Sequence, residues 1–172
     1  SIVLLKNDGD VLPLAPEQKI AVIGAFATEP RFQGAGSSLI NPTRVDKALD
    51  ELRAVAGDTV SYAAGFGVEG GAIAASGRTA EDLRDEAVAA ASAADVAVVF
   101  LGLPAAEESE GFDREHIDLP AAQLAVLDAV IEANPATVVV LSNGGVVALP
   151  FADRVPAILE TWLLGQAGGG AV

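Results

Sequence analysis

Residues 107–114 concentrate the side chains of this chain that are best suited to acid–base chemistry. Five of the eight are charged, and the acidic ones are Glu107, Glu108, Glu110 and Asp113. Crowded carboxylates disfavour one another's charge, which raises the pKa of a carboxyl group. A carboxyl group that is still protonated near neutral pH is what general acid catalysis requires. The segment is therefore a candidate catalytic loop, and a solvated surface loop is the alternative.

Two further groups of residues belong to this first set of candidates. Asp113 and Arg114 are adjacent and of opposite charge, so an ion pair could anchor the acidic loop. Gly36, Ser37 and Ser38 follow one another in a polar, glycine-rich stretch. That stretch is either a simple turn or part of a binding site.

Composition and motifs exclude several other kinds of chemistry. The chain has no cysteine and a single histidine, His116, so thiolate nucleophiles and multi-histidine metal sites are excluded and no metal site is expected. His116 itself fits a surface or helix-entry position, whereas Trp162 fits either the core or the rim of a site. Residues 65–70 match G-x-G-x-x-G, but no helical pattern opens at the last glycine, and G-K-[ST] is absent.

Charge and hydropathy exclude two classes of partner. With 24 acidic and ten basic residues, the formal net charge is −14. Such a surface repels phosphate backbones, which disfavours nucleic-acid binding. No apolar run approaches the roughly 20 residues of a membrane helix, so no membrane association is expected.

The elements that must position these residues alternate between apolar runs and amphipathic segments. Capping boxes of the form Thr-x-x-Asp at Thr43 and Thr79 predict two helix starts, and Pro120 suits the first turn of a third. This alternation predicts βαβ units and a mostly parallel sheet sandwiched between helices on both faces, which is an α/β sandwich. The expected strands are 2–5, 19–24, 59–64, 96–102, 137–141 and 157–162, and the expected helices are 43–57, 79–94 and 120–134.

The predicted topology selects the loops where function should lie. In an open parallel sheet, ligands bind beyond the carboxyl ends of the strands. Those ends deliver residues 25–43, 103–119, 143–151 and 165–166, and the first two contain the candidates named above. The segment 65–78, rich in glycine, alanine and serine, is expected to be the most flexible loop.

The chain is expected to be one domain of a longer protein. It contains no methionine, it has no basic and apolar leader, and its length of 172 residues suits a single domain over 1–172. The compartment stays open, because a leader would precede residue 1.

Taken together in order, these segments resemble the second domain of glycoside hydrolase family three, the β-glucosidase and β-xylosidase family. The resemblance covers nearly the whole chain. The segments that carry it are residues 1–9, 12–14, 19–24, 36–38, 94–99, 108–114, 119–123, 143–144, 149–151 and 162–166.

The resemblance implies an α/β sandwich beside a (β/α)₈ barrel of the same polypeptide. It also implies hydrolysis of terminal β-glucosides or β-xylosides, or of oligosaccharides that contain them, by a retaining mechanism. The barrel would supply an aspartate nucleophile, and this chain would supply a glutamate as general acid/base. The family pattern puts that glutamate at Glu108, with Glu110 and Glu107 as alternates. The resemblance implies no cofactor, and the residues expected to contact substrate are Gly36, Ser37, Ser38, Phe112, Asp113 and Arg114.

Two other functions compete with this interpretation. A non-catalytic sugar-binding or interaction module could use the same scaffold. A receiver-like or nucleotide-binding domain is disfavoured, because residues 25–27 are Ala-Phe-Ala where such domains need acids or a phosphate loop. Since eight βα units need about 250 residues, this chain contains no barrel and is expected to be inactive alone.

Overall fold

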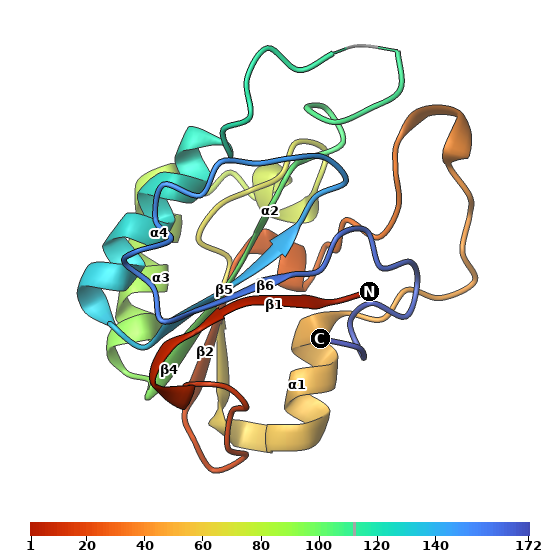
Figure 1. Cartoon of the computed structure of the whole chain (residues 1–172). Helices are drawn as coiled ribbons and strands as arrows, with labels where there is room; N and C mark the ends of the chain where they lie inside the picture. The colour runs from red at the N-terminus through yellow and green to blue at the C-terminus, as the bar shows by residue number, and fades with distance from the viewer. Residues whose placement is uncertain (112) are drawn as a thin grey trace.

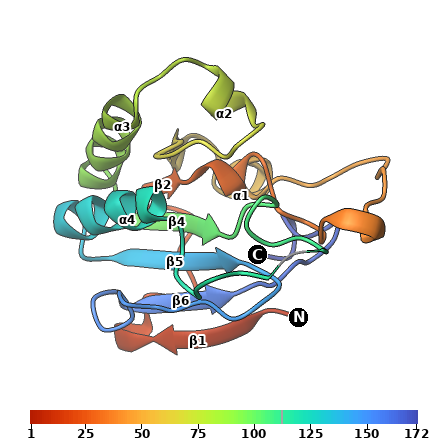
Figure 2. The same cartoon turned by 90° about the horizontal axis from the view of Figure 1, so that it is seen from above.

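A six-stranded sheet forms the centre of the computed structural model, which describes residues 1–111 and 113–172. The strand order is β1-β6-β5-β4-β2-β3. All neighbouring pairs are parallel except β1 and β6, which are antiparallel at one edge. Figure 2 shows β4, β5, β6 and β1 side by side in that order. The bounds are β1 Val3–Asn7, β2 Ile20–Ile23, β3 Val60–Ala63, β4 Val96–Gly102, β5 Thr137–Ser142 and β6 Ala157–Glu160.

The central strands are parallel because both of their faces are covered. Every residue of β2 and β4 is buried, and these strands read as continuous apolar runs rather than as alternating patterns. Strands of this kind occur where helices cover both faces of a parallel sheet. The predicted mostly parallel α/β sandwich is confirmed.

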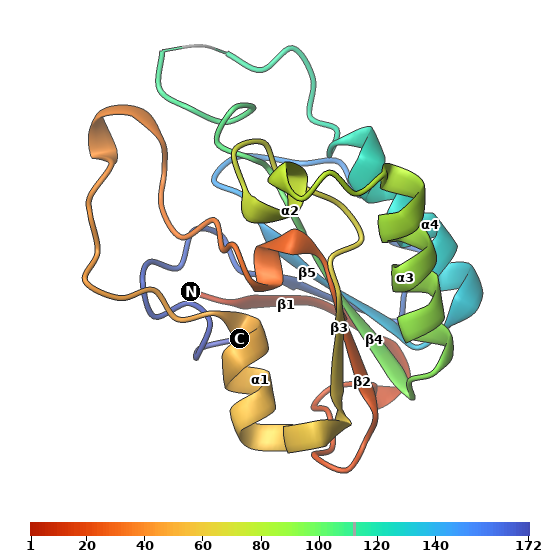
Figure 3. The ribbon, with the colours of Figure 1, turned by 180° about the vertical axis from the view of Figure 1, so that it is seen from behind.

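The helices form the outer layers of this sandwich. Figures 1 and 3 show α3 and α4 on one face of the sheet and α1 on the other. Helix α3 contacts β3 and α4 contacts β4, while α1 reaches the sheet at β3. The bounds are α1 Ala48–Ala56, α2 Ala72–Ala75, α3 Ala80–Ser92 and α4 Ala121–Ala133. The short α2 lies inside the segment expected to be a flexible loop.

One of the two predicted capping boxes is present and the other is not. Thr79 accepts a hydrogen bond from the Asp82 N–H, and the Asp82 carboxylate accepts one from the Thr79 N–H, at the start of α3. The prediction at Thr43 is wrong, because α1 begins at Ala48 and Lys47 makes no side-chain cap. The Asp46 N–H instead donates to the Gln166 carbonyl at 2.8 Å. A tertiary contact therefore holds residues before Ala48 outside the helix.

Two buried amides fasten α4 to the rest of the fold. Gln123 accepts from the Gly102 N–H and donates to the Gly102 carbonyl, which completes the end of β4. Asn134 donates to the carbonyls of Ala91 and Ala94 at the end of α3, and it accepts from the Ala136 N–H before β5. Buried backbone groups need such partners. Within the described ranges, no helix is long and apolar enough to cross a membrane.

Candidate functional site

The carboxyl ends of the parallel strands meet at one edge of the sheet, as the strand order requires. The register brings Ile23 beside Val99 and Gly102 beside Ser142, and Glu160 ends the next strand. The long segments that follow β2 and β4 both leave from this edge, as the orange and green traces of Figure 1 show. The two segments that contain the candidate residues therefore start at the carboxyl ends of the strands, as the sequence predicted.

Arg31 ties these two segments together. Its Nη1 donates to the Leu103 carbonyl at 2.6 Å, its Nη2 to the Glu108 carbonyl at 2.8 Å, and its Nε to the Gln33 carbonyl at 3.0 Å. Its side chain is only 7% exposed, and Nη1 lies 3.5 Å from Glu108 Oε2. Burial lowers the pKa of Arg31, and the charge of Glu108 acts in the opposite direction. The sequence reasoning missed Arg31, which stands alone in a polar stretch.

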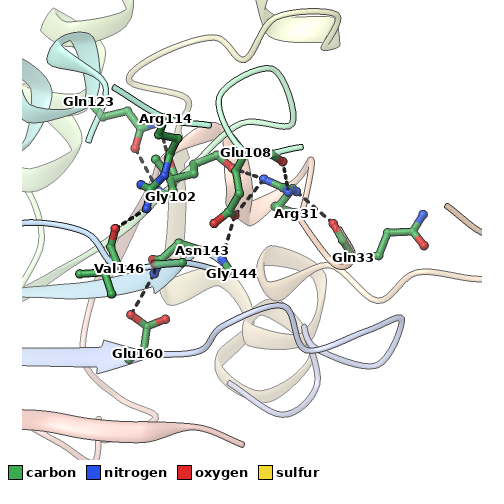
Figure 4. A network of polar contacts seen from close by, with 12 residues as sticks. Arg31, Gln33, Gly102, Glu108, Arg114, Gln123, Asn143, Gly144, Val146 and Glu160 are labelled. Carbon is green, nitrogen blue, oxygen red and sulfur yellow. Dashed lines mark hydrogen bonds and ion pairs between the residues drawn. The ribbon is translucent and has the colours of Figure 1, made fainter. Parts of the chain in front are cut away.

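Glu108 and Arg114 fix both ends of the acidic loop to the turn after β5. The Gly144 N–H donates to Glu108 Oε2 at 2.8 Å, and Arg114 Nη2 donates to the Val146 carbonyl at 2.6 Å. Figure 4 shows Glu108 between Arg31 and Gly144. Gly145 passes so close that an added Cβ would lie 3.0 Å from both Arg114 Nη2 and Glu108 Oε1. We call residues 143–146 the floor turn.

The predicted anchor by an Asp113–Arg114 ion pair is wrong. Within residues 1–111 and 113–172, neither residue belongs to an ion pair. Asp113 is exposed, and Arg114 turns to a backbone carbonyl of the floor turn instead. An exposed carboxylate gains little from an ion pair, because water already solvates it.

Glu110 lies between these two anchors and meets the other candidate segment. The Ser37 N–H donates to Glu110 Oε2 at 2.7 Å, and the Ser37 hydroxyl contacts the same oxygen. Gly36 has φ +84°, and a Cβ there would come within 2.6 Å of the Glu110 Cβ. The glycine is therefore needed for this close approach.

Ser37 also changes the ionisation of Glu110. Hydrogen bonds from the Ser37 hydroxyl and backbone lower the pKa of Glu110 below its ordinary value. The expectation that crowding raises the pKa of a carboxyl in this loop is therefore wrong for Glu110. Donors from a distant segment outweigh the effect of desolvation, since hydrogen bonds to a carboxylate favour its ionised form.

The carboxyl group with a raised pKa is Glu160, at the end of β6. Burial raises its pKa, the charge of Glu108 adds to that rise, and hydrogen bonds from the Trp162 N–H and the Asn143 amide act against it. Glu160 is 6% exposed and lies below the floor turn, as Figure 4 shows. The sequence reasoning did not select it. The available signal was an acidic residue that ends a buried apolar strand.

The remaining candidates do not join this cluster. In the described part of the chain, the Ser38 side chain makes no hydrogen bond with the acidic loop. Glu107 lines a separate hollow with Arg114 and His116 at the start of α4, and His116 is exposed on the surface. Trp162 is 43% exposed, so it lies at the rim of this edge rather than in the core. Phe112 lies outside the described residues.

No cluster of three or more histidine, cysteine or acidic residues placed to hold a metal ion is found in residues 1–111 and 113–172. The polar groups at this edge bind one another instead. What they offer a ligand is a carboxyl group, Glu110, held on an exposed loop between Ser37 and the floor turn.

Comparison with known proteins gives a consistent picture. The sequence model of the glycosyl hydrolase family 3 C-terminal domain matches residues 2–172. Thermostable beta-glucosidase B of Acetivibrio thermocellus is 49% identical over 174 residues, which is all of this chain and 22% of that protein. An exo-alpha-(1->6)-L-arabinopyranosidase of Bifidobacterium longum is 49% identical over 182 residues, and the chain covers 23% of it.

A solved structure agrees with these sequence matches. The crystal structure of a GH3 beta-glucosidase of Bifidobacterium adolescentis superposes with a TM-score of 0.88 and 52% sequence identity. The superposition covers 99% of this chain and 24% of that one. The chain thus spans about a quarter of the length of these relatives.

Proposed function

The chain belongs to the C-terminal domain family of glycosyl hydrolase family 3, and on that premise we propose that it supplies the general acid/base of a retaining β-glycosidase. The observation that carries the proposal is the placement of Glu110. It is an exposed carboxyl group at the carboxyl edge, on a loop fastened on either side by Glu108 and Arg114. Catalytic groups on loops need such a rigid support.

Among the three candidate glutamates, the geometry favours Glu110 over Glu108 and Glu107. The Glu108 carboxylate is already bound by the Gly144 N–H beside Arg31, and its side chain is 18% exposed. It therefore serves to hold the loop. Glu107 lies toward the separate hollow beside α4. Glu110 combines exposure with contact to Ser37, a residue that the resemblance also assigns to substrate binding.

Glu110 would act in both steps of a retaining mechanism. In the first step its carboxylic acid donates a proton to the departing glycosidic oxygen while a nucleophilic carboxylate forms a bond to the anomeric carbon. In the second step the Glu110 carboxylate takes a proton from water as that water displaces the nucleophile. Ser37 favours the carboxylate in this chain. A domain that covers Glu110 and excludes water would raise its pKa toward that of a general acid.

The nucleophile is proposed to come from a (β/α)₈ barrel elsewhere in the same polypeptide. Retaining glycosidases hold their two carboxyl groups about 5 Å apart, so the barrel has to dock on the edge that carries Glu110. The great length of the relatives agrees with further domains in such proteins. The substrate is proposed to be a terminal β-glucoside or β-xyloside, and no cofactor takes part.

The test is azide rescue in the full-length polypeptide. Glu110→Ala, Glu108→Ala and Glu107→Ala are assayed with p-nitrophenyl β-glucoside, β-xyloside and α-L-arabinopyranoside. We expect azide to restore turnover of Glu110→Ala and to yield a β-glycosyl azide, because the small anion takes the place of the activated water. Rescue of Glu108→Ala instead would move the acid/base to that residue. A fully active Glu110→Ala protein would refute its assignment.

Two controls separate this proposal from its alternative. The 172-residue chain alone should show no turnover, and turnover free of contaminants would contradict the shared site. A full-length protein that binds sugars but hydrolyses none of these glycosides would favour a non-catalytic sugar-binding module. The best wild-type substrate defines the sugar class.

A further inference from the structure

Glu160 is a buried carboxyl group that the proposed mechanism does not use. Within the described residues it belongs to no ion pair. Its partners are neutral: the Asn143 Nδ2 at 3.3 Å from Oε2 and the Trp162 N–H at 2.9 Å from Oε1. A carboxylate taken out of water without a cation is costly. Its two hydrogen bonds reach Asn143 in the floor turn and the backbone at Trp162.

The first hydrogen bond supports the floor turn from below. Asn143 Nδ2 donates both to Glu160 Oε2 and to the Gly145 carbonyl, so one amide group ties the turn to the end of β6. The next residue, Gly144, donates its N–H to Glu108 on the upper side. Figure 4 shows this order, from Glu160 through Asn143 and Gly144 to Glu108. Three steps thus connect Glu160 to the loop that carries Glu110.

The second hydrogen bond fixes the backbone that follows β6. Trp162 has φ +55°, a conformation that costs a non-glycine residue on the order of 1 kcal/mol or more. Glu160 Oε1 accepts the N–H of this residue. One carboxyl group therefore holds both the floor turn and the backbone that presents the exposed Trp162 ring at the same edge.

We propose that Glu160 is a positioning residue that sets the place of the Glu110 loop through Asn143 and the floor turn. This inference rests on the proposed function, because it takes Glu110 as the acid/base. Glu160 itself touches neither Glu108 nor Glu110 by a hydrogen bond in the described residues. Glu160 acts through position alone. A shift of the floor turn would move the Gly144 N–H that binds Glu108, and the loop that carries Glu110 would move with it.

The informative variant is Glu160→Gln. Glutamine has the same shape, and its oxygen can still accept from the Trp162 N–H. Its amide nitrogen, however, would face the Asn143 Nδ2, so two donors would meet and the floor turn would move. A displacement of about 1 Å can cost a hundredfold in rate. We expect a loss of about tenfold or more in kcat with little change in KM.

Leaving-group dependence separates positioning from a loss of folded protein. A dinitrophenyl glycoside needs little protonation of its leaving group, whereas a disaccharide needs it fully. If Glu160 positions the acid, Glu160→Gln lowers kcat/KM, which reports the first step, about tenfold for the disaccharide and by less than about twofold for the dinitrophenyl glycoside. The matched control is Glu132→Gln, an exposed glutamate on α4, which should change neither rate.

A double variant tests the connection to Glu110 directly. In a Glu110→Gln background, adding Glu160→Gln should slow the disaccharide no further, since the acid is already absent. If Glu160→Gln does not fold, Asn143→Ser removes the same link and should show the same leaving-group dependence.

The outcomes distinguish this inference from the proposed function. A full-length protein without glycosidase activity, or a Glu110→Gln protein whose kcat/KM falls equally on both substrates, would refute the proposed function. A protein in which Glu110→Gln behaves as proposed, but Glu160→Gln slows both substrates equally or neither, would refute the positioning role alone.

Discussion

Two buried side chains join separate parts of this chain, Asn134 three of them and Arg31 two, and they do so with different chemistry. Asn134 joins the ends of α3 and α4 to the start of β5 with a neutral amide. Arg31, at the carboxyl edge, joins the segments after β2 and β4 with a guanidinium. An amide can be buried without a counter-charge, whereas a guanidinium attracts one, and here Glu108 lies beside it. In this comparison, the buried charged side chain lies at the carboxyl edge, and the neutral one lies at the opposite edge of the sheet.

The largest effect should come from removing Arg31. Arg31→Ala would leave the carbonyls of Leu103, Glu108 and Gln33 without this donor and Glu108 without its cation. Breaking a buried ion pair costs several kcal/mol, and the partial exposure of Glu108 reduces that cost. We expect a loss of about 3 kcal/mol in the free energy of unfolding, measured by urea denaturation. Arg31→Lys keeps the charge but cannot donate to all three carbonyls in the same geometry.

If both Arg31 variants are as stable as the wild type, the side chain does not organise this edge. A smaller loss for Arg31→Lys than for Arg31→Ala would measure the part that charge alone contributes. The two losses of unfolding free energy therefore separate the contribution of the Arg31 charge from that of its hydrogen bonds.

A smaller effect is expected at Asn134, on stability alone. Asn134→Ala leaves the carbonyls of Ala91 and Ala94 and the Ala136 N–H without this partner. We expect a loss of about 2 kcal/mol in the free energy of unfolding. In the full-length protein, the kcat of the folded fraction should be unchanged, because Asn134 lies at the other edge of the sheet. A fall in kcat without a fall in stability would contradict the contrast between the two regions.

The smallest effect on stability, and a specific effect on pH dependence, is expected at Ser37. The Ser37 hydroxyl favours the ionised form of Glu110 and lowers its pKa. Ser37→Ala therefore raises that pKa. Because the first catalytic step needs the protonated form, the alkaline limb of kcat/KM should move to higher pH. The matched control is Ser38→Ala, which removes a neighbouring hydroxyl that does not bind Glu110 in the described residues.

A shift of the alkaline limb to lower pH, or an equal shift for both serine variants, would contradict the role assigned to Ser37. Stability should change by less than about 0.5 kcal/mol in either variant, since both residues are exposed.

Local signals in the sequence predicted elements well where neighbouring residues decide the outcome. The capping box of Thr79 and Asp82 closes within one helical turn, and the prediction of that helix start is confirmed. The same pattern at Thr43 failed because Gln166, more than a hundred positions away, binds the Asp46 N–H. The buried run of β4 needs only its own apolar residues, so its being a strand of the sheet was predictable.

The candidate site was predictable in part. The parallel order of the strands placed the acidic loop and the residues 36–38 at one edge, and Ser37 does meet Glu110 there. Nothing local marked Arg31, and the local signal for Glu160 did not reveal its partners, because each residue is defined by contacts with other segments. The pKa of Glu110 also depends on a contact with another segment. Crowding within the loop predicted a raised pKa, but a donor from another loop lowers that of Glu110.

The sequence by itself determined the family, the strands, the three longer helices apart from the start of α1, and the loop that carries the acidic residues. These depend on periodicity, on capping and on motifs in a fixed order, all of which are properties of residues close together in the chain. Only the tertiary structure decided which glutamate holds the loop and which stays exposed on it. That distinction depends on burial and on hydrogen-bond partners, and both arise only when distant segments come together across the edge of the sheet.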